Sequence, residues 1–340
     1  MVATLKDIAA QAGVSTTTVS RILNQRTSGV PIREETRQKV LAIALELGYQ
    51  PNLMARALRG SRSALLGVIA QNITSRFQSQ ILRGLNDVAI SRGYRVFLGN
   101  VQRKSDIAID YGSMFEQFHA DGILVVGGWA NDQAALNFLL RHHAYIVGIT
   151  DRVSRRDFPG VYADSHIGVQ LAMDHLWALG HRKIACVFDP TIQDGQMRSD
   201  VYQAYMREHD AQAHIRLHPS GRSFHGSFLT GQALFAASDR PTAIFAVTDA
   251  IAIGLMQAAF QSGIPVPDQI SIVGFDDIDL AGFTIPPLTT IRQSGVEMGQ
   301  IAANLLLNMI EQKQSSADVE DIILTPTLVV RQSTAAPSSA

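Results

Sequence analysis

Polar and aromatic residues directly follow four apolar runs of this 340-residue chain. They are Asn72, Ser75 and Phe77 after residues 64–70, Asp151 and Arg152 after 145–149, Thr248 and Asp249 after 243–247, and Asp276 and Asp277 after 270–275. Carboxylates accept hydrogen bonds from hydroxyls, an arginine fork donates them, and an aromatic ring covers the apolar side of a sugar. The set predicts a site for a sugar or another small polar molecule.

Three of these residues also have a simple structural explanation. Asp249 precedes a helical stretch that starts at Ala250, so we expect it to cap that helix and not to bind a ligand. Asp277 is expected to be a cap as well, and Arg152 is equally well explained as a surface charge. Asp276 is the acid that we expect to contact a ligand.

No enzymatic motif accompanies these residues. The sequence has no G-x-G-x-x-G after a strand, no phosphate-binding loop, no G-x-S-x-G, and no histidine pair at zinc-ligand spacing backed by a carboxylate base. His142 and His143 are predicted to be solvated, and His181 to stabilise a turn. The one cysteine, Cys186, lies in an apolar run and is predicted to be a buried thiol in a reducing compartment. We predict no catalytic residues, no metal and no cofactor.

Residues 4–23, TLKDIAAQAGVSTTTVSRIL, predict two short helices joined by a tight turn. Thr4 and Asp7 can form a capping box, Gly13 can end the first helix, and Ser15 can cap the second. The second helix places Thr16, Thr17, Ser20 and Arg21 away from its apolar face. Polar side chains near the start of such a helix read base edges in the major groove of DNA, and arginine commonly reads guanine. A plain helical hairpin is the alternative.

Two further helices are predicted before residue 62. Residues 34–47 have helical apolar spacing and end at Gly48. Residues 52–60, NLMARALRG, form a shorter basic helix that is marginal on its own in water. Its exposed Leu58, beside Arg56 and Arg59, suits a wedge in the minor groove of DNA. An interdomain linker is the alternative.

Charge separates this head from the rest of the chain. Residues 1–62 hold nine Lys and Arg against four Asp and Glu, whereas the later residues hold twenty against twenty-six. The basic head attracts phosphates, and the acidic remainder is not expected to bind DNA.

The later residues alternate between apolar strands and helices. Predicted strands cover residues 64–70, 95–98, 122–126, 145–149, 184–188, 243–247 and 270–274, with helical stretches such as 167–179 and 251–262 between them. This alternation predicts doubly wound parallel sheets with a ligand outside the carboxyl ends of the strands. About 280 residues exceed one such domain, so two lobes are expected.

These segments together resemble the lactose-repressor (LacI/GalR) family of bacterial transcription regulators. The head carries TLKDIAAQAGVSTTTVSRILN, ETRQKVLAIALELGYQPN and ARALRG, and the body carries VYADSHIGVQLAMDHLWALGHRKIA, PTAIFAVTDAIAIG, VPDQISIVGFDD and PPLTTIRQ. The resemblance implies an all-α helix-turn-helix head followed by a two-lobed α/β, periplasmic-binding-protein-like body with doubly wound parallel sheets. Its three crossovers are expected near residues 162, 292 and 323.

The resemblance also implies domain boundaries and site residues. The domains are 1–50 for the head, 51–62 for the hinge helix and linker, 63–162 plus 293–323 for the first lobe, 163–292 plus 324–332 for the second, and 333–340 for a flexible tail. The implied effector-binding residues are Ser75, Phe77, Asp151, Arg198, Thr248, Asp276 and Gln293, joined by Arg152 and by an aromatic residue that is either Phe224 or Phe228. Arg198 begins RSDVY, in which Val201 replaces the usual glycine and Tyr202 keeps the aromatic.

Operator-binding residues follow in the same way. They are Ser15, Thr16, Thr17, Ser20, Arg21 and Asn24 in the head, and Asn52, Ala55, Arg56 and Leu58 in the hinge helix. A homodimer is expected on pseudo-palindromic double-stranded DNA, with a sugar-like effector. The segment after Val330 has no heptads, so no coiled-coil tetramer is expected. Arg33 stands where a serine cap is usual, which predicts a weaker cap on the third helix.

Two other classes of protein would share part of this pattern. A secreted solute-binding protein would share the body but begin with a signal peptide, which the first residues do not resemble. An enzyme with a cleft would need a nucleophile or a metal cluster. No apolar run reaches the ~18 residues that span a membrane. We therefore expect a cytoplasmic allosteric regulator of transcription, most simply a repressor.

Overall fold

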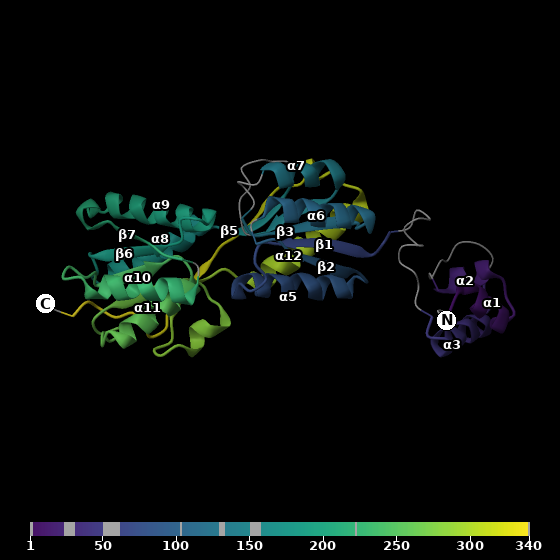
Figure 1. Cartoon of the computed structure of the whole chain (residues 1–340), viewed down its shortest axis with the longest axis horizontal. Coiled ribbons are helices and arrows are strands. Elements are labelled where there is room, and N and C mark those ends of the chain that lie inside the picture. The colour runs from purple at the N-terminus through teal and green to yellow at the C-terminus, as the bar shows by residue number, and fades with distance from the viewer. Residues whose placement is uncertain are drawn as a thin grey trace. The chain divides into compact units, whose positions relative to one another are not determined.

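The computed structural model describes residues 3–23, 31–49, 62–102, 104–128, 133–149, 158–221 and 223–338. They form two compact units, Met1–Ser63 and Ala64–Ala340 (Figure 1). The expected hinge-helix residues Asn52, Ala55, Arg56 and Leu58, together with Asn24, Asp151 and Arg152, lie outside the described residues.

Among its described residues, the first unit contains three helices, α1 (Leu5–Ala12), α2 (Thr16–Leu23) and α3 (Glu34–Glu46). Their buried side chains form one core, Ile8, Ala9, Ala12, Val19, Ile22, Val40 and Ala44. The predicted capping box is confirmed, since Asp7 N donates to Thr4 Oγ1 at 3.4 Å and Thr4 N donates to Asp7 Oδ2 at 2.8 Å. Gly13 ends α1 with φ of 71°. Arg33 gives α3 no side-chain cap, as its sequence position predicts.

The first sheet of the body is wholly parallel, in the order β11-β5-β4-β3-β1-β2. Its strands are β1 (Leu65–Ala70), β2 (Arg95–Asn100), β3 (Gly122–Val126), β4 (Ile146–Ile149), β5 (Gly160–Ala163) and β11 (Ile322–Leu324). Helices α5 (Arg76–Ser91) and α12 (Gly295–Gln312) cover one face, and α6 (Ser105–Gln117) and α7 (Gln133–His142) the other (Figure 1). A Cβ on Gly84 or Gly299 would overlap the facing helix, so these glycines allow α5 and α12 to pack closely.

The second sheet has the order β12-β10-β9-β8-β6-β7, with only β12 antiparallel. Its strands are β6 (Ile184–Phe188), β7 (Arg216–Pro219), β8 (Ala243–Ala246), β9 (Ser271–Asp276), β10 (Thr289–Arg292) and β12 (Thr327–Val329). Helices α8 (Ser165–Ala178) and α9 (Gln193–Glu208) lie on one face, and α10 (Phe224–Ala236) and α11 (Asp249–Gln261) on the other (Figure 1). Short 3₁₀ turns span Gln212–His214, Asp279–Phe283 and Ser316–Asp318.

The chain passes between the two sheets three times. It leaves the first sheet after Ala163, returns after Arg292, and leaves again after Leu324. These positions stand beside the expected crossovers near 162, 292 and 323. The two α/β sheets and the helical head confirm the predicted fold class.

Two segments differ from expectation. Helical apolar spacing in the sequence starts only at Ile81, but helix α5 already begins at Arg76, because Ser75 caps it by accepting a hydrogen bond from Gln78 N at 3.4 Å. The end of the chain was expected to be a flexible tail from residue 333. Instead Ser333 is fully buried, accepts from Thr289 N at 2.8 Å and donates to the Ile272 carbonyl at 2.6 Å.

Candidate functional site

A cavity of about 70 Å³ lies between the two sheets of the body. Its first-sheet side comes from the ends of β1 and β3 and the start of α5, and its second-sheet side from α9, β8 and β9. The lining residues are Gln71, Ser75, Phe77, Gln78, Gly127, Gly128, Ile192, Asp194, Gly195, Arg198, Thr248, Asp276 and Gln293. Six of the nine expected effector residues therefore meet in one place: Ser75, Phe77, Arg198, Thr248, Asp276 and Gln293.

Arg198 is the buried cation of this cavity. Its Nη1 donates to the Val247 carbonyl at 2.7 Å and its Nε to Ser165 Oγ at 3.3 Å. The guanidinium carbon lies 3.7 Å from the centroid of the Phe275 ring, a cation–π arrangement. Asp194 and Asp276 approach it only to 3.8 and 3.7 Å, longer than hydrogen bonds. Three of its five N–H groups thus remain available to a bound molecule.

Asp276 and Gln293 form a second polar pair. Gln293 Nε2 donates to Asp276 Oδ1 at 2.6 Å, and both residues are buried. Burial raises the pKa of the Asp276 carboxyl above its ordinary value, while the nearby Arg198 opposes that rise. Asp276 has φ of 125° and Asp277 has φ of 54°, conformations that non-glycine residues rarely adopt. Such strain collects at functional sites and at hinges.

Thr248 and Phe77 occupy the first turns of helices. Thr248 caps α11, because its hydroxyl accepts from Ile251 N at 3.3 Å. Phe77 lies in the first turn of α5 and is 9% exposed. A helix N-terminus carries partial positive charge, so both helices present that charge to the cavity.

The second-lobe aromatic expected at the site lies elsewhere. Phe224 begins α10, is 42% exposed, and is not among the residues that line the cavity. Phe228 packs against the core of the second lobe. Tyr202 is fully buried, donates to the Ile184 carbonyl at 2.6 Å and accepts from Arg216 N at 3.1 Å. Its hydroxyl therefore ties α9 to two strands.

Asp249 and Asp277 are not helix caps as the sequence suggested. Asp249 is fully buried, accepts from Ile278 N at 2.8 Å and accepts from the Thr290 hydroxyl. Asp277 instead bridges two arginines, with 2.6 Å to Arg292 Nε and 2.6 Å to Arg331 Nη2. Both acids brace the segment that follows β9, which fixes the position of Asp276.

Sequence reasoning missed Gln71, Gln78 and the first turn of α9. Gln71 is the first residue after β1, so the strand-end rule that selected Asn72 could have found it. Its Nε2 donates to the Gly128 carbonyl at 3.1 Å. Gly127 has φ of 97°, and a Cβ there would overlap Gln71 and Gln78. Ile192 and Asp194 carry no comparable sequence signal.

The histidine predictions were partly wrong. His143 is buried and its Nε2 lies 3.0 Å from the Gly112 carbonyl, because α7 packs against α6 there. His142 is exposed, as predicted, and its Nδ1 lies 3.0 Å from Glu116 Oε2. The structural role of His181 is confirmed by its contacts to Thr242, Ser271 and Ala335.

The predicted burial of Cys186 is also confirmed, and burial raises the pKa of its thiol. Within the described residues, no cluster of His, Cys, Asp and Glu could hold a metal ion. The helices of those same residues include none long and apolar enough to cross a bilayer.

The first unit presents a polar helix surface. Ser15, Thr16 and Thr17 are exposed at the start of α2, whereas Ser20 and Arg21 are half-buried. Ser15 also caps α2, as predicted, since Thr18 N donates to its Oγ at 3.1 Å. The buried face of α2 is Val19 and Ile22. Thr16 and Thr17 therefore lie on the solvent-exposed side of α2.

A helix-turn-helix joined to a two-sheet body with a polar cavity defines a class of protein, the ligand-controlled DNA-binding regulators. Two family profiles match the chain, "Bacterial regulatory proteins, lacI family" at residues 4–52 and "Periplasmic binding protein-like domain" at residues 173–334. The ribose operon repressor of Escherichia coli (strain K12) is 31% identical over 97% of this chain and 99% of that protein. The transcriptional repressor PurR of Vibrio vulnificus is 33% identical over 97% of this chain and 98% of that protein. The chain belongs to the lacI family of bacterial regulatory proteins, and it is a DNA-binding transcriptional repressor.

Solved structures agree with this assignment. The lac repressor dimer bound to operator and the anti-inducer ONPF has a TM-score of 0.88 at 27% identity, over 99% of this chain and 100% of that chain. A LacI-family regulator from Enterococcus faecium with bound ribose has a TM-score of 0.73 at 27% identity, over 80% of this chain and 99% of that chain.

Proposed function

We propose that this repressor binds a pseudo-palindromic operator as a homodimer in the cytoplasm, and that a small polyhydroxylated effector between the two sheets controls that binding. The observation that carries the proposal is the buried polar cluster of Arg198, Asp276 and Gln293 at a cavity that both sheets line. Buried polar groups of this kind are costly unless they have partners. A ligand rich in hydroxyls would supply those partners.

The cluster matches a sugar in its hydrogen-bonding capacity. Arg198 offers donors, the Asp276 carboxylate offers an acceptor oxygen that Gln293 does not use, and Thr248 adds a hydroxyl. Phe77 supplies an aromatic surface from the opposite lobe. The ribose bound by the Enterococcus faecium relative supports this ligand class. We propose Asp151 and Arg152 as further contacts, although they lie outside the described residues.

The operator would be read by α2. Its exposed start carries Thr16 and Thr17, and the surrounding residues 1–62 are basic. The lac repressor structure bound to operator supports the same use of the head. We propose Ser15, Ser20, Arg21 and Asn24 as further contacts in the major groove, with the 52–58 segment in the minor groove.

Coupling requires the two lobes to move. The cavity of about 70 Å³ is smaller than the ~300–1,000 Å³ typical of small-molecule sites. Entry of a sugar ring would therefore separate the sheets. An effector shifts the DNA-binding equilibrium only if it binds the open and closed arrangements with different affinity.

A thermal-shift screen of the full chain tests the proposal. Pentoses, hexoses and nucleobases would be compared with and without operator DNA selected from a random library. A specific ligand raises the melting temperature by mass action and changes operator affinity in parallel. If a nucleobase stabilised the protein and no sugar did, the effector would be a nucleobase and the proposed ligand class would be wrong. Failure to select any palindromic site would refute the proposed operator.

A further inference from the structure

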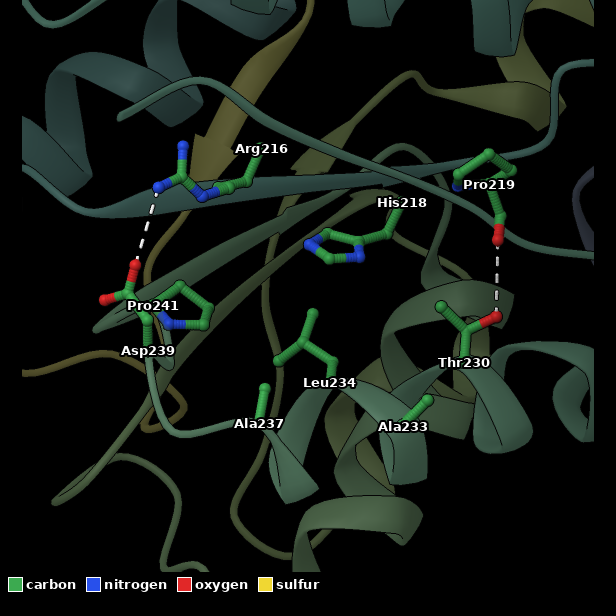
Figure 2. Close-up of a pocket in the computed structure, with 9 residues that line it drawn as sticks. All are labelled: Arg216, His218, Pro219, Thr230, Ala233, Leu234, Ala237, Asp239 and Pro241. Carbon is green, nitrogen blue, oxygen red and sulfur yellow. Dashed lines mark hydrogen bonds and ion pairs between the residues drawn. The ribbon is translucent and has the colours of Figure 1, made fainter. Parts of the chain in front are cut away.

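A second, larger hollow lies at the outer edge of the second lobe, between β7 and α10 (Figure 2). Its volume is about 530 Å³, within the ~300–1,000 Å³ of small-molecule sites. Strand β7 is an edge strand that pairs only with β6. The residues that line the hollow are Arg216, His218, Pro219, Thr230, Ala233, Leu234, Ala237, Asp239 and Pro241, and none of them lines the cavity between the sheets.

The floor of this β7–α10 groove is apolar, and a proline ring stands at each end. Leu234 is 4% exposed and forms the floor, with Ala233 and Ala237 on the same helix side. Two proline rings, Pro219 and Pro241, stand at opposite ends (Figure 2). These surfaces suit a flat apolar ring, because aromatic rings bury a large area against aliphatic carbons at little entropic cost.

His218 adds a polar group to the groove. Its ring projects from β7 into the groove, above Leu234 (Figure 2). Burial, and then the neighbouring Arg216, lower the pKa of His218, so its imidazole is neutral near pH 7. No hydrogen bond to either ring nitrogen is present among the described residues. A neutral imidazole offers one donor and one acceptor.

One end of the groove carries excess positive charge. Arg216 Nη2 lies 3.4 Å from Asp239 Oδ2, and Lys183 Nζ lies 3.0 Å from Asp239 Oδ1. Two cations therefore share one carboxylate. Arg216 Nη1 is held by the carbonyls of Ala213 and Ile215, each at 3.1 Å, which fixes the guanidinium at the mouth.

We propose that the β7–α10 groove is a second ligand site, which binds a small aromatic carboxylate. The carboxylate lies at the Arg216 end, where it balances the second cation. The ring packs on Leu234 between the two prolines, and a polar substituent bonds the imidazole of His218. This site is separate from the one between the sheets, and the chain would thus sense two molecules.

The test uses 4-hydroxybenzoate as the probe and 4-hydroxybenzamide as its uncharged analogue. Binding to the full chain is measured by calorimetry. Ala233→Trp fills the groove from its exposed side and should weaken probe binding at least ten-fold. Ala236→Trp places the same ring on an exposed position of α10 that does not line the groove, and should change the affinity less than two-fold. Melting curves establish that both variants fold.

A second comparison tests whether Arg216 binds the carboxylate. The unmodified chain should prefer the acid over the amide by about five-fold, the factor expected for one exposed ion pair. Arg216→Gln should remove that preference. The proposal is overturned if the unmodified chain shows no saturable binding of the probe, or if Ala233→Trp binds it as well as the unmodified chain does. Equal losses in the two tryptophan variants, or an acid preference that survives Arg216→Gln, would also overturn it.

Discussion

Replacing Asp276 with asparagine separates ligand binding from folding. The substitution keeps an acceptor oxygen for Gln293 Nε2 and removes the carboxylate charge. A hydrogen bond to a charged group contributes about 1.5–3 kcal/mol. Effector affinity should therefore fall about 10- to 150-fold. Operator affinity without effector should stay unchanged, because asparagine keeps the hydrogen bond from Gln293 and residue 276 lies outside the DNA-binding head.

Stability should move in the opposite direction. Burial raises the pKa of Asp276, which means that the folded chain disfavours its charged form. Asparagine removes that charge, so the melting temperature at pH 8 should stay within about 2 °C of the unmodified value or rise above it. Weaker effector binding by a variant of unchanged stability would identify the Asp276 carboxylate as a binding group and exclude a general loss of structure.

Effector affinity is measured by calorimetry with the effector found in the screen, and operator affinity by fluorescence anisotropy with operator DNA. Asp279→Asn is the matched control, since it removes one exposed carboxylate three residues away and should alter effector affinity less than two-fold. Unchanged effector affinity in Asp276→Asn would remove this residue from the site. A fall of more than about 5 °C in melting temperature would show that Asp276 braces the fold instead.

Three further predictions follow from the same structure. Thr17→Ala changes a residue on the exposed start of α2 and should weaken binding to the selected operator by about 1 kcal/mol in an anisotropy titration. Binding to random DNA should stay unchanged. Equal losses of affinity for the operator and for random DNA would contradict base reading by Thr17. Phe283 is 83% exposed, and we expect its side chain to be buried against the partner chain of the proposed dimer, where it would contribute about 2 kcal/mol in each chain. Phe283→Asp should therefore convert the dimer to monomers in sedimentation velocity. A dimer that persists would exclude Phe283 from the interface. Burial raises the pKa of Asp249 to about 7 from 3.8, so its contribution to stability is complete below pH 4 and is lost as pH rises through 7. Asp249→Asn should therefore gain stability relative to the unmodified chain between pH 4 and 8, by at most about 4 kcal/mol in thermal denaturation, and a pH-independent difference would contradict this.

The sequence predicted the fold class because apolar periodicity reports burial directly. The runs that became β3, β6 and β8 are fully buried and β1 is buried except at Leu65, so their ends could be placed within a residue or two. Strand β7 escaped notice because Arg216–Pro219 is a half-exposed edge without an apolar run. Ser333 escaped notice because a small hydroxyl residue reveals its burial only through its tertiary partners.

Site residues were predictable only where chain geometry forces them together. Residues just past the carboxyl ends of parallel strands must meet, and this rule selected Thr248 and Asp276, which both line the cavity. The same rule included Asp249 and Asp277 as neighbours of the site, but it gave no information about their partners Thr290 and Arg331, which come from distant strands. Arg198 was implied only by family resemblance. Helix α9 has polar residues on several sides, so its sequence does not indicate that Arg198 is buried.

The position of the polar cluster explains how a ligand could act on the lobes. Asp276 ends β9, and Gln293 immediately follows β10, where the chain crosses to the first sheet. Ser294 at this crossing has positive φ, and so do Asp276 and Asp277 at the end of the neighbouring strand β9, so the backbone is strained in both segments. A ligand that takes the place of the Gln293–Asp276 hydrogen bond would perturb two strained segments at once. The effector contacts proposed above would therefore lie on segments beside a crossing between the lobes, so that differential binding to two arrangements of the lobes would need no longer pathway.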